Sequence, residues 1–264
     1  MGKTKKNSNY QTPKKEAARL LLETEEKRAK RKKIILAIGI PVVAIALIVT
    51  IILSIVLGWF KPKENEVTYI ATIIFGEYEG VEDEDGKPIN AVVEIELYGN
   101  AAPITVANFV KLCKEKYYDG TYFHRYVHNE KNPNEIHVLQ GGDGDGTVDG
   151  ITNGLDEIKG EFSANGVKNN IKHERGTISM ARSGYDMNSA SSQFFIVMET
   201  SESNTKSLDG NYAAFGKVRS GMKYIDMMCA NCPVSNLIPD YQAPRILSLF
   251  VETPEEYAKR TADV

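Results

Sequence analysis

The chain divides into three regions by its pattern of apolar and polar positions. Residues 1–33 are polar and rich in charge, whereas residues 34–60 are apolar apart from Thr50 and Ser54 and carry no charged side chain. From residue 67 onward, short apolar runs alternate with polar residues. An uninterrupted apolar run of about 20 residues or more is long enough to cross a hydrocarbon core of about 30 Å as a helix. The pattern therefore predicts a transmembrane helix over residues 34–60.

A cleaved signal peptide is the alternative for a basic region followed by an apolar one. Here the apolar run is long, the basic region is extended, and no small-x-small cleavage site follows residues 57–60. We therefore expect an uncleaved signal-anchor. Because twelve Lys or Arg residues precede the span and only Lys61 and Lys63 flank its other end, the positive-inside rule predicts a basic cytoplasmic tail over residues 1–33. The remainder of the chain is expected outside the cell membrane.

Beyond a linker at residues 61–66, the pattern is typical of a mainly β domain. Two alternating runs, 69–75 and 91–98, flank a Gly- and Pro-containing turn and predict a hairpin. Pro103 begins a predicted helix over residues 103–116, because proline suits the first helical turn and apolar residues follow at helical spacing. A second short helix is predicted at residues 221–230.

Residues 192–197 predict a strand that carries a candidate site. Small polar residues lead into a run of aromatic and β-branched residues, as where a strand enters a core. Strand alternation places Gln193 and Phe195 on one face and Phe194 and Ile196 on the other. An amide beside an aromatic ring suits a shallow apolar pocket with one polar group. A glutamine at the edge of a sheet, without any binding role, is the alternative.

Charge is distributed unevenly along the 264 residues. The formal net charge is −3, but residues 1–33 hold twelve basic and four acidic residues, and the remainder holds 20 basic and 31 acidic residues. The basic run next to the apolar segment is explained by membrane topology, so we expect no nucleic-acid partner.

Metal, redox and hydrolase chemistry have weak support. Residues 143–150 are rich in Asp and Gly but lack the spacing of a calcium loop, and the four histidines are scattered, so we expect no metal and no cofactor. Cys229 and Cys232 form a C-x-x-C at a helix end, where a local disulfide or two free thiols both remain open. No G-x-S-x-G motif is present to support a Ser-His-Asp hydrolase.

Several motifs occur together in one order along the second half of the chain. They are residues 102–110, 118–125, 140–143, 180–184, 192–197 and 208–218. In these motifs the chain resembles the cyclophilin family of peptidyl-prolyl cis/trans isomerases over about residues 67–251. The resemblance implies a closed antiparallel eight-stranded barrel capped by two helices, with residues 252–264 as a C-terminal tail.

The resemblance assigns catalysis to Arg125, Gln140 and Phe195. The barrier to X-Pro isomerisation is the partial double bond of the amide, about 18–20 kcal/mol. In the twisted amide the prolyl nitrogen accepts a hydrogen bond, which its planar form cannot. A guanidinium beside that nitrogen, the expected role of Arg125, therefore stabilises the transition state alone. Gln140 is expected to hold the arginine and contact the substrate.

The resemblance also implies a set of substrate-binding positions. They are Phe123, His137, Ala181, Arg182, Gln193, Leu208 and Tyr212. Phe195 and Leu208 match the floor of the proline pocket, and Arg182 stands where many members have Asn. Tyr212 replaces a histidine, as in bacterial-type members. The connection between Arg125 and Gln140 is longer than in compact members, so the pocket phenylalanine corresponds to His137 unless Ile136 fills that space.

The sequence therefore predicts a membrane-anchored, bacterial-type prolyl isomerase. Its expected partners are proline-containing segments of exported or cell-surface polypeptides, whose folding it assists, and the chain is expected to be a monomer. The alternative is a non-catalytic module that binds proline-containing segments through the same groove, with the insertion at residues 126–139 as its recognition loop. The changes at His137 and at Ser207, where many members have Trp, favour this alternative, whereas Arg125 favours an enzyme.

Overall fold

The computed structural model describes residues 13–35, 48–50, 65–82, 88–128, 136–144, 154–230, 232, 237–238 and 243–262. The chain forms two compact units, residues 1–61 and 62–264. In the first unit, helix α1 (Pro13–Ile34) ends in Arg31, Lys32 and Lys33, whose charges suit the negative end of the helix dipole. No helix within the described residues has the length and apolar character needed to cross a membrane. Most of the span predicted at residues 34–60 lies outside the described residues.

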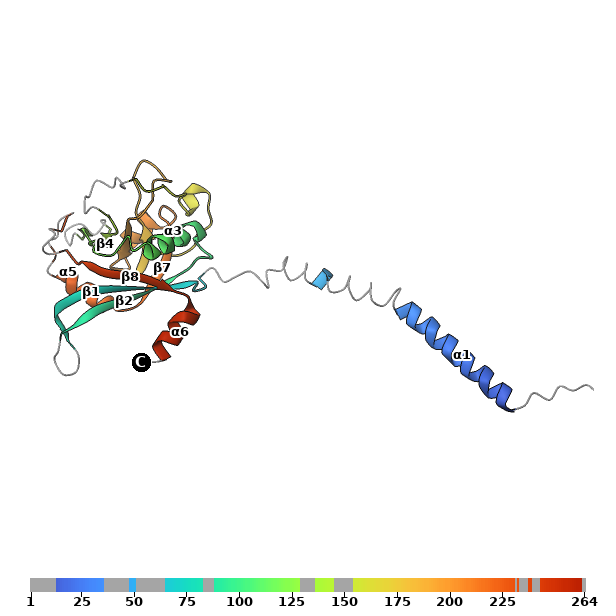
Figure 1. Cartoon of the computed structure of the whole chain (residues 1–264). Helices are drawn as coiled ribbons and strands as arrows, with labels where there is room; N and C mark the ends of the chain where they lie inside the picture. The colour runs from blue at the N-terminus through green and yellow to red at the C-terminus, as the bar shows by residue number, and fades with distance from the viewer. Residues whose placement is uncertain are drawn as a thin grey trace, which may run out of the picture. The chain divides into compact units, whose positions relative to one another are not determined.

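The second unit is built on one eight-stranded sheet. Its neighbouring strands pair in an antiparallel sense in the order β3-β4-β6-β5-β7-β2-β1-β8. The strands are β1 (Tyr69–Glu82), β2 (Pro88–Leu97), β3 (Arg125–Val127), β4 (Val138–Gly141), β5 (Thr177–Met180), β6 (Phe194–Val197), β7 (Ala214–Ser220) and β8 (Ile246–Glu252). Figure 1 shows β1, β2 and β8 side by side.

The sheet is open, so the predicted closed barrel is wrong. Among the described residues β3 and β8, the two ends of the strand order, share no ladder. An isolated bridge between Tyr122 and Arg245 joins the segments just before these strands instead. The physical reason is that β3 has only 3 residues and pairs with β4 on one side. The mainly β class and the strand number are confirmed.

Two helices cover the sheet where the sequence predicts them. Helix α3 (Pro103–Lys114) has Pro103 in its first turn and turns Val106, Phe109 and other apolar residues inward. The buried carboxylate of Glu161 accepts hydrogen bonds from the backbone N–H groups of Ile104 and Thr105, at 3.1 and 2.8 Å, and so caps this helix. Helix α5 (Met222–Ala230) buries Ile225 against the sheet.

Two further helices are absent from the sequence-based prediction. Helix α4 (Glu202–Leu208) begins at Ser201, whose hydroxyl accepts a hydrogen bond from the Asn204 N–H. Helix α6 (Pro254–Ala262) occupies most of the segment predicted as a C-terminal tail. Thr253 and Glu256 cap it reciprocally, since each side chain accepts a hydrogen bond from the backbone N–H of the other. A short 3-10 helix, η2, covers Ser163–Asn165.

Buried apolar residues form two separate clusters. The main core contains interlocking rings, with Phe194 in edge-on contact with Phe109, Tyr118 and Phe123. The second cluster is small and lies on the other face of β6. It consists of Val127, Val138, Phe195, Val197 and Leu208, with Ile136, Ala181 and Tyr212 packed against it. This second cluster forms the floor of the pocket described next.

Candidate active site

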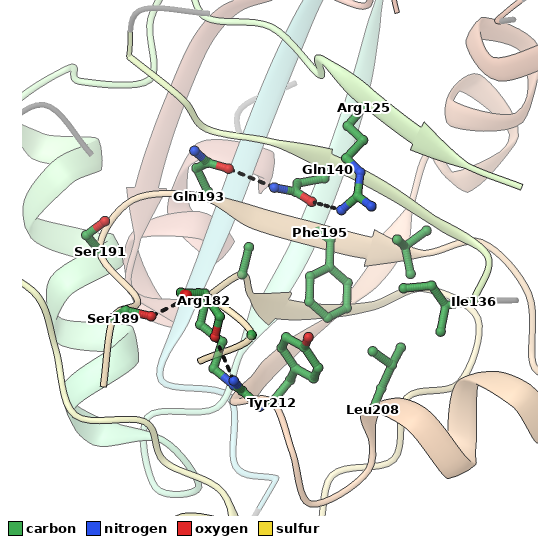
Figure 2. Close-up of a pocket in the computed structure, with 14 residues that line it drawn as sticks. Arg125, Ile136, Gln140, Arg182, Ser189, Ser191, Gln193, Phe195, Leu208 and Tyr212 are labelled. Carbon is green, nitrogen blue, oxygen red and sulfur yellow. Dashed lines mark hydrogen bonds between the residues drawn. The ribbon is translucent and has the colours of Figure 1, made fainter. Parts of the chain in front are cut away.

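A pocket of about 330 Å³ opens over the second apolar cluster. Its apolar end is made by Ile136, Val138, Phe195, Leu208 and Tyr212. Phe195 lies in the middle of the site in Figure 2, with Ile136 and Leu208 to one side of it. The ring of Tyr212 meets that of Phe195 edge-on, with centroids 5.6 Å apart at 82°. This end has the apolar character of a site for a compact apolar side chain.

A chain of hydrogen bonds crosses the opposite wall of the pocket. The Arg125 guanidinium donates from Nη1 to Oε1 of Gln140 at 3.0 Å, and Gln140 Nε2 donates to Oε1 of Gln193 at 2.7 Å (Figure 2). Gln193 in turn donates from Nε2 to Oδ2 of the buried Asp143 at 2.9 Å. Because the amide nitrogen of Gln193 is used on Asp143, its Oε1 is left to accept from Gln140, and the bond to Asp143 fixes the direction of both amides. The acceptor end of Gln140 therefore faces Arg125 and holds its cation over the pocket.

Strand pairing brings these groups together. Arg125 on β3 lies opposite Gln140 on β4, and Gln140 lies opposite Phe195 on β6. Alternation along β6 sends Gln193 and Phe195 into the pocket and Phe194 into the main core, as predicted. A cation, an amide and an aromatic ring therefore meet on one face of three adjacent strands.

A buried Ser-His-Asp arrangement supports Phe195 from behind. The ring of His173 stacks on that of Phe195, with centroids 6.1 Å apart at 22°. His173 Nδ1 is 3.0 Å from Oδ1 of Asp209, and Nε2 is 3.0 Å from Oγ of Ser179. Burial lowers the pKa of His173, which favours the neutral ring. Ser179 is fully buried and does not line the pocket, so this arrangement positions Phe195 and cannot act as a hydrolase triad.

The structure brings eight of the predicted site residues into this one pocket. They are Arg125, Gln140, Ala181, Arg182, Gln193, Phe195, Leu208 and Tyr212. The guanidinium of Arg182 lies over the Tyr212 ring, 4.7 Å from its centroid, and 5.3 Å from that of Phe162. Its Nε donates to the Asn211 carbonyl at 3.0 Å. Arg182 is therefore a fixed part of the pocket wall.

Phe123 and His137 are the two predicted substrate-binding residues that lie elsewhere. Phe123 is fully buried in the main core, where it stacks on Phe75 with centroids 5.8 Å apart. His137 faces away from the pocket, beside Tyr126 and stacked on His128 with ring centroids 3.9 Å apart. Its Nε2 is 2.9 Å from the Tyr126 hydroxyl, and burial lowers its pKa. The sequence left the choice between His137 and Ile136 open at this position, and Ile136 is the residue that lines the pocket.

The pocket contains further residues that the sequence did not indicate. Ile136, Val138 and Gln140 are two residues apart and share one face of the strand. Because Gln140 was already assigned to the pocket, this alternation could have predicted Val138 as a lining residue. The other lining residues are Ser183, Gly184, Ser189 and Ser191. They lie in the loop between β5 and β6, whose course follows from its own hydrogen bonds and has no periodic pattern.

The remaining candidate chemistry takes no part in the pocket. All three cysteines are buried free thiols, and Cys232 Sγ donates to the Met228 carbonyl at 3.2 Å. Within the described ranges no cluster of three or more His, Cys, Asp or Glu residues could hold a metal ion. Most of the Asp- and Gly-rich segment 143–150 lies outside those ranges.

Comparison with known proteins identifies the family. Residues 88–249 match the family described as cyclophilin type peptidyl-prolyl cis-trans isomerase/CLD. The chain belongs to the cyclophilin family. The matched residues include every residue that lines the pocket. The activity of this cyclophilin is accordingly peptidyl-prolyl cis/trans isomerisation.

Individual relatives carry the same activity in their names. The chain is 38% identical to a peptidyl-prolyl cis-trans isomerase of Acinetobacter baylyi over 54% of this chain and 69% of that protein. It is 41% identical to peptidyl-prolyl cis-trans isomerase B of Bacillus subtilis over 55% of this chain and 85% of that protein. A solved cyclophilin of Cryptosporidium parvum shares the fold, with a TM-score of 0.51, at 22% identity over 71% of this chain and 99% of the other.

Proposed function

We propose that this cyclophilin isomerises X-Pro bonds in exported or cell-surface polypeptides and so assists their folding. The observation that carries the catalytic part is the position of Arg125, which Gln140 and Gln193 hold beside an apolar pocket floored by Phe195. A proline ring in that pocket has its amide nitrogen near the pocket rim, where the guanidinium lies.

In the proposed mechanism Arg125 donates a hydrogen bond to the prolyl nitrogen as the amide twists. The planar nitrogen has no lone pair to accept this bond, so the interaction develops with the twist and lowers the barrier. The apolar end holds the ring while the carbonyl side rotates. No bond to the substrate forms or breaks, and the protein needs only orientation and one charge-assisted hydrogen bond.

The alternative of a non-catalytic binding module loses part of its support. It rested partly on a polar His137 in the wall of the proline pocket. Ile136 occupies that wall instead, and together with Val138 and Leu208 it keeps the pocket apolar. The relay from Asp143 through Gln193 and Gln140 directs the Arg125 cation over the pocket, where an apolar ring alone needs no charge, and this favours the enzyme.

We propose that the cyclophilin is a single-pass membrane protein of the bacterial type, with its N-terminus in the cytoplasm and its catalytic unit outside. The support is the charge-free apolar run at residues 34–60 and the excess of basic residues before it. Tyr212, which the family resemblance associates with bacterial-type members, supports the bacterial type.

Two measurements test these parts separately. NMR exchange spectroscopy of a proline tetrapeptide with the full chain in detergent micelles should show accelerated cis/trans interconversion. An interconversion rate equal to that of the peptide alone would contradict the proposed enzymatic activity. Protease added to intact or wall-stripped cells should degrade the catalytic unit and leave residues 1–33 protected. Resistance of the catalytic unit until the cells are lysed would contradict the proposed location and, with it, the exported substrates.

A further inference from the structure

A dense run of basic residues lies at the end of helix α1, apart from the pocket and its mechanism. Figure 1 shows α1 as one unbroken helix, and it ends at Ile34, where the charge-free apolar run of the sequence begins. Six of the seven residues at 27–33 are cationic and are called the basic collar here: Lys27, Arg28, Lys30, Arg31, Lys32 and Lys33. All six are exposed. The isomerisation mechanism gives these charges no task.

The basic collar surrounds the helix and does not form one face of it. Successive residues of an α-helix are rotated by about 100°, so the six cations leave no gap wider than about 100° around the axis. At 1.5 Å per residue they occupy about 10 Å along it. A helix that lies flat on a membrane has a basic face opposite an apolar one. The collar therefore suits a helix that passes through a charged layer along its own axis.

The apolar residues of α1 lead to the same orientation. Leu20, Leu21 and Leu22 are 59%, 65% and 62% exposed, and because they are consecutive they are spread around the helix axis. They give α1 no continuous apolar stripe of the kind that a surface-lying helix buries. The apolar surface expected to meet lipid is the run that follows Ile34, and the collar lies directly before it.

The charges of the basic collar are available to a partner. The acidic residues of α1 all precede the collar, at positions 16, 23, 25 and 26. Glu23 pairs with Arg19 at 3.3 Å, also ahead of the collar. The six collar cations form no ion pair with any residue that the structure describes. Six uncompensated positive charges within about 10 Å favour a partner that offers many closely spaced anions.

An anionic lipid surface offers such anions at the matching place. The headgroup layer is about 5–8 Å deep on each side of the hydrocarbon core, and Lys and Arg side chains extend along a helix to reach it. With residues 34–60 in the core, as proposed above, the collar lies in this layer or next to it. The positive-inside rule requires only an excess of basic residues on this side. It does not require that half of the twelve lie within seven residues of the core.

We infer that the basic collar binds the headgroups of anionic phospholipids in the cytoplasmic leaflet and so gathers these lipids around the end of α1. The recognition is by charge and does not depend on headgroup shape. The inference rests on the proposed membrane span and adds a class of lipid partner to it. A nucleic acid is the other polyanion that a basic run can bind, but it would need the collar to lie away from the headgroups.

The test measures which lipid the full chain holds around itself. The chain is reconstituted in vesicles of zwitterionic phosphatidylcholine and anionic phosphatidylglycerol, with a trace of either lipid in spin-labelled form. Electron paramagnetic resonance gives the fraction of each labelled lipid whose motion the protein restricts. At low salt, labelled phosphatidylglycerol should associate about 2- to 5-fold more strongly than labelled phosphatidylcholine. In about 0.5 M salt this ratio should fall toward 1, because salt screens exposed charges.

Variants with equal loss of charge assign the preference to the collar. Replacing the six collar residues with Gln should bring the lipid ratio to about 1. The matched control replaces with Gln the other six basic residues before the span, Lys3, Lys5, Lys6, Lys14, Lys15 and Arg19. It should leave the ratio within about 1.5-fold of the parent value, because those charges lie farther from the apolar run. Gln favours helices about as well as Lys and Arg, so far-UV circular dichroism should show unchanged helix content in both.

The outcomes separate this inference from the proposed function. Equal association of the two labelled lipids with the parent chain, or an equal loss of preference in the two variants, would overturn the inference. Tight binding of single-stranded RNA by the full chain in micelles, together with equal lipid association, would make a nucleic acid the partner. Alkaline carbonate extraction of the same vesicles tests the span itself. Release of the chain would contradict the span and the inference together, whereas a retained chain without lipid preference would contradict the inference alone.

Discussion

Replacing Gln140 with Leu isolates the contribution that the hydrogen-bond relay makes to catalysis. The change keeps most of the side-chain volume but removes the acceptor that holds Arg125 Nη1 at 3.0 Å and the donor that reaches Gln193 at 2.7 Å. Arg125 keeps its charge and its place on β3. What it loses is the group that fixes its direction over the pocket.

The expected size of the effect follows from the bond that is lost. A hydrogen bond to a charged group contributes about 1.5–3 kcal/mol, and each 1.36 kcal/mol in the activation barrier changes the rate tenfold. We therefore expect kcat/KM for a proline tetrapeptide to fall about 10- to 100-fold. Gln193→Leu, one step further along the relay, removes a neutral bond to Gln140 and should cost about 3- to 10-fold. It should also lower the melting temperature, because buried Asp143 loses one of its donors.

A double-mutant cycle shows whether Gln140 acts through Arg125. If it does, Gln140→Leu should change the rate of the Arg125→Ala variant by no more than about twofold. The assay is exchange spectroscopy with each folded variant, with far-UV circular dichroism as the control for folding. Full activity of Gln140→Leu, or an equal loss in both backgrounds, would refute the role of Gln140 as the residue that orients Arg125.

Two histidines give further predictions, one from the position of His137 and one from the lowered pKa of His173. His137 lies outside the pocket, so His137→Phe should leave kcat/KM within about twofold of the parent value. The dependence of kcat/KM on pH from 5 to 8 should be parallel for the two proteins, and a flatter dependence in the variant would place His137 in the pocket. Burial lowers the pKa of His173 below 6.5, so the unfolded chain takes up the proton first and the free energy of unfolding should fall as the pH drops below 6.5. Urea unfolding at pH 7.5 and 5.5 should show a smaller decrease for His173→Gln, and an unchanged decrease would exclude His173 as its source.

Regular patterns allowed much of the second unit to be predicted. Helices α3 and α5 begin and end within a few residues of their predicted limits, because Pro103 and helical apolar spacing define them. Helix α4 has no such spacing, since its buried residues are mainly small and polar. Helix α6 was missed although its capping box, Thr253 with Glu256, was present in the sequence. The sheet stays open because β3 has only 3 residues, and the residue preferences for strands do not predict so short a strand.

The sequence left His137 and Ile136 open as the residue that lines the pocket, and the position of Ile136 there has a simple physical origin. Counting back along the family pattern ignored the alternation of the strand to which Gln140 belongs. Once Gln140 faces the pocket, Val138 and Ile136 share its face, while His137 and Leu139 face the opposite side. Phe123 precedes β3 and follows no strand alternation, so its burial in the core depends on the rings around it. The positions of Ser189 and Ser191 in the pocket depend on loop geometry, for which the sequence has no periodic signal.

The central claim is that the Arg125 guanidinium stabilises the twisted prolyl amide. The most direct measurement is the cis-to-trans rate constant of a proline tetrapeptide with the parent chain and with Arg125→Ala. Arg125 lines the pocket and is not part of either apolar cluster, so the variant should remain folded. Loss of a transition-state hydrogen bond of about 2–4 kcal/mol predicts a rate lower by about 30- to 1000-fold. A folded Arg125→Ala variant that isomerises the peptide as fast as the parent would contradict the account.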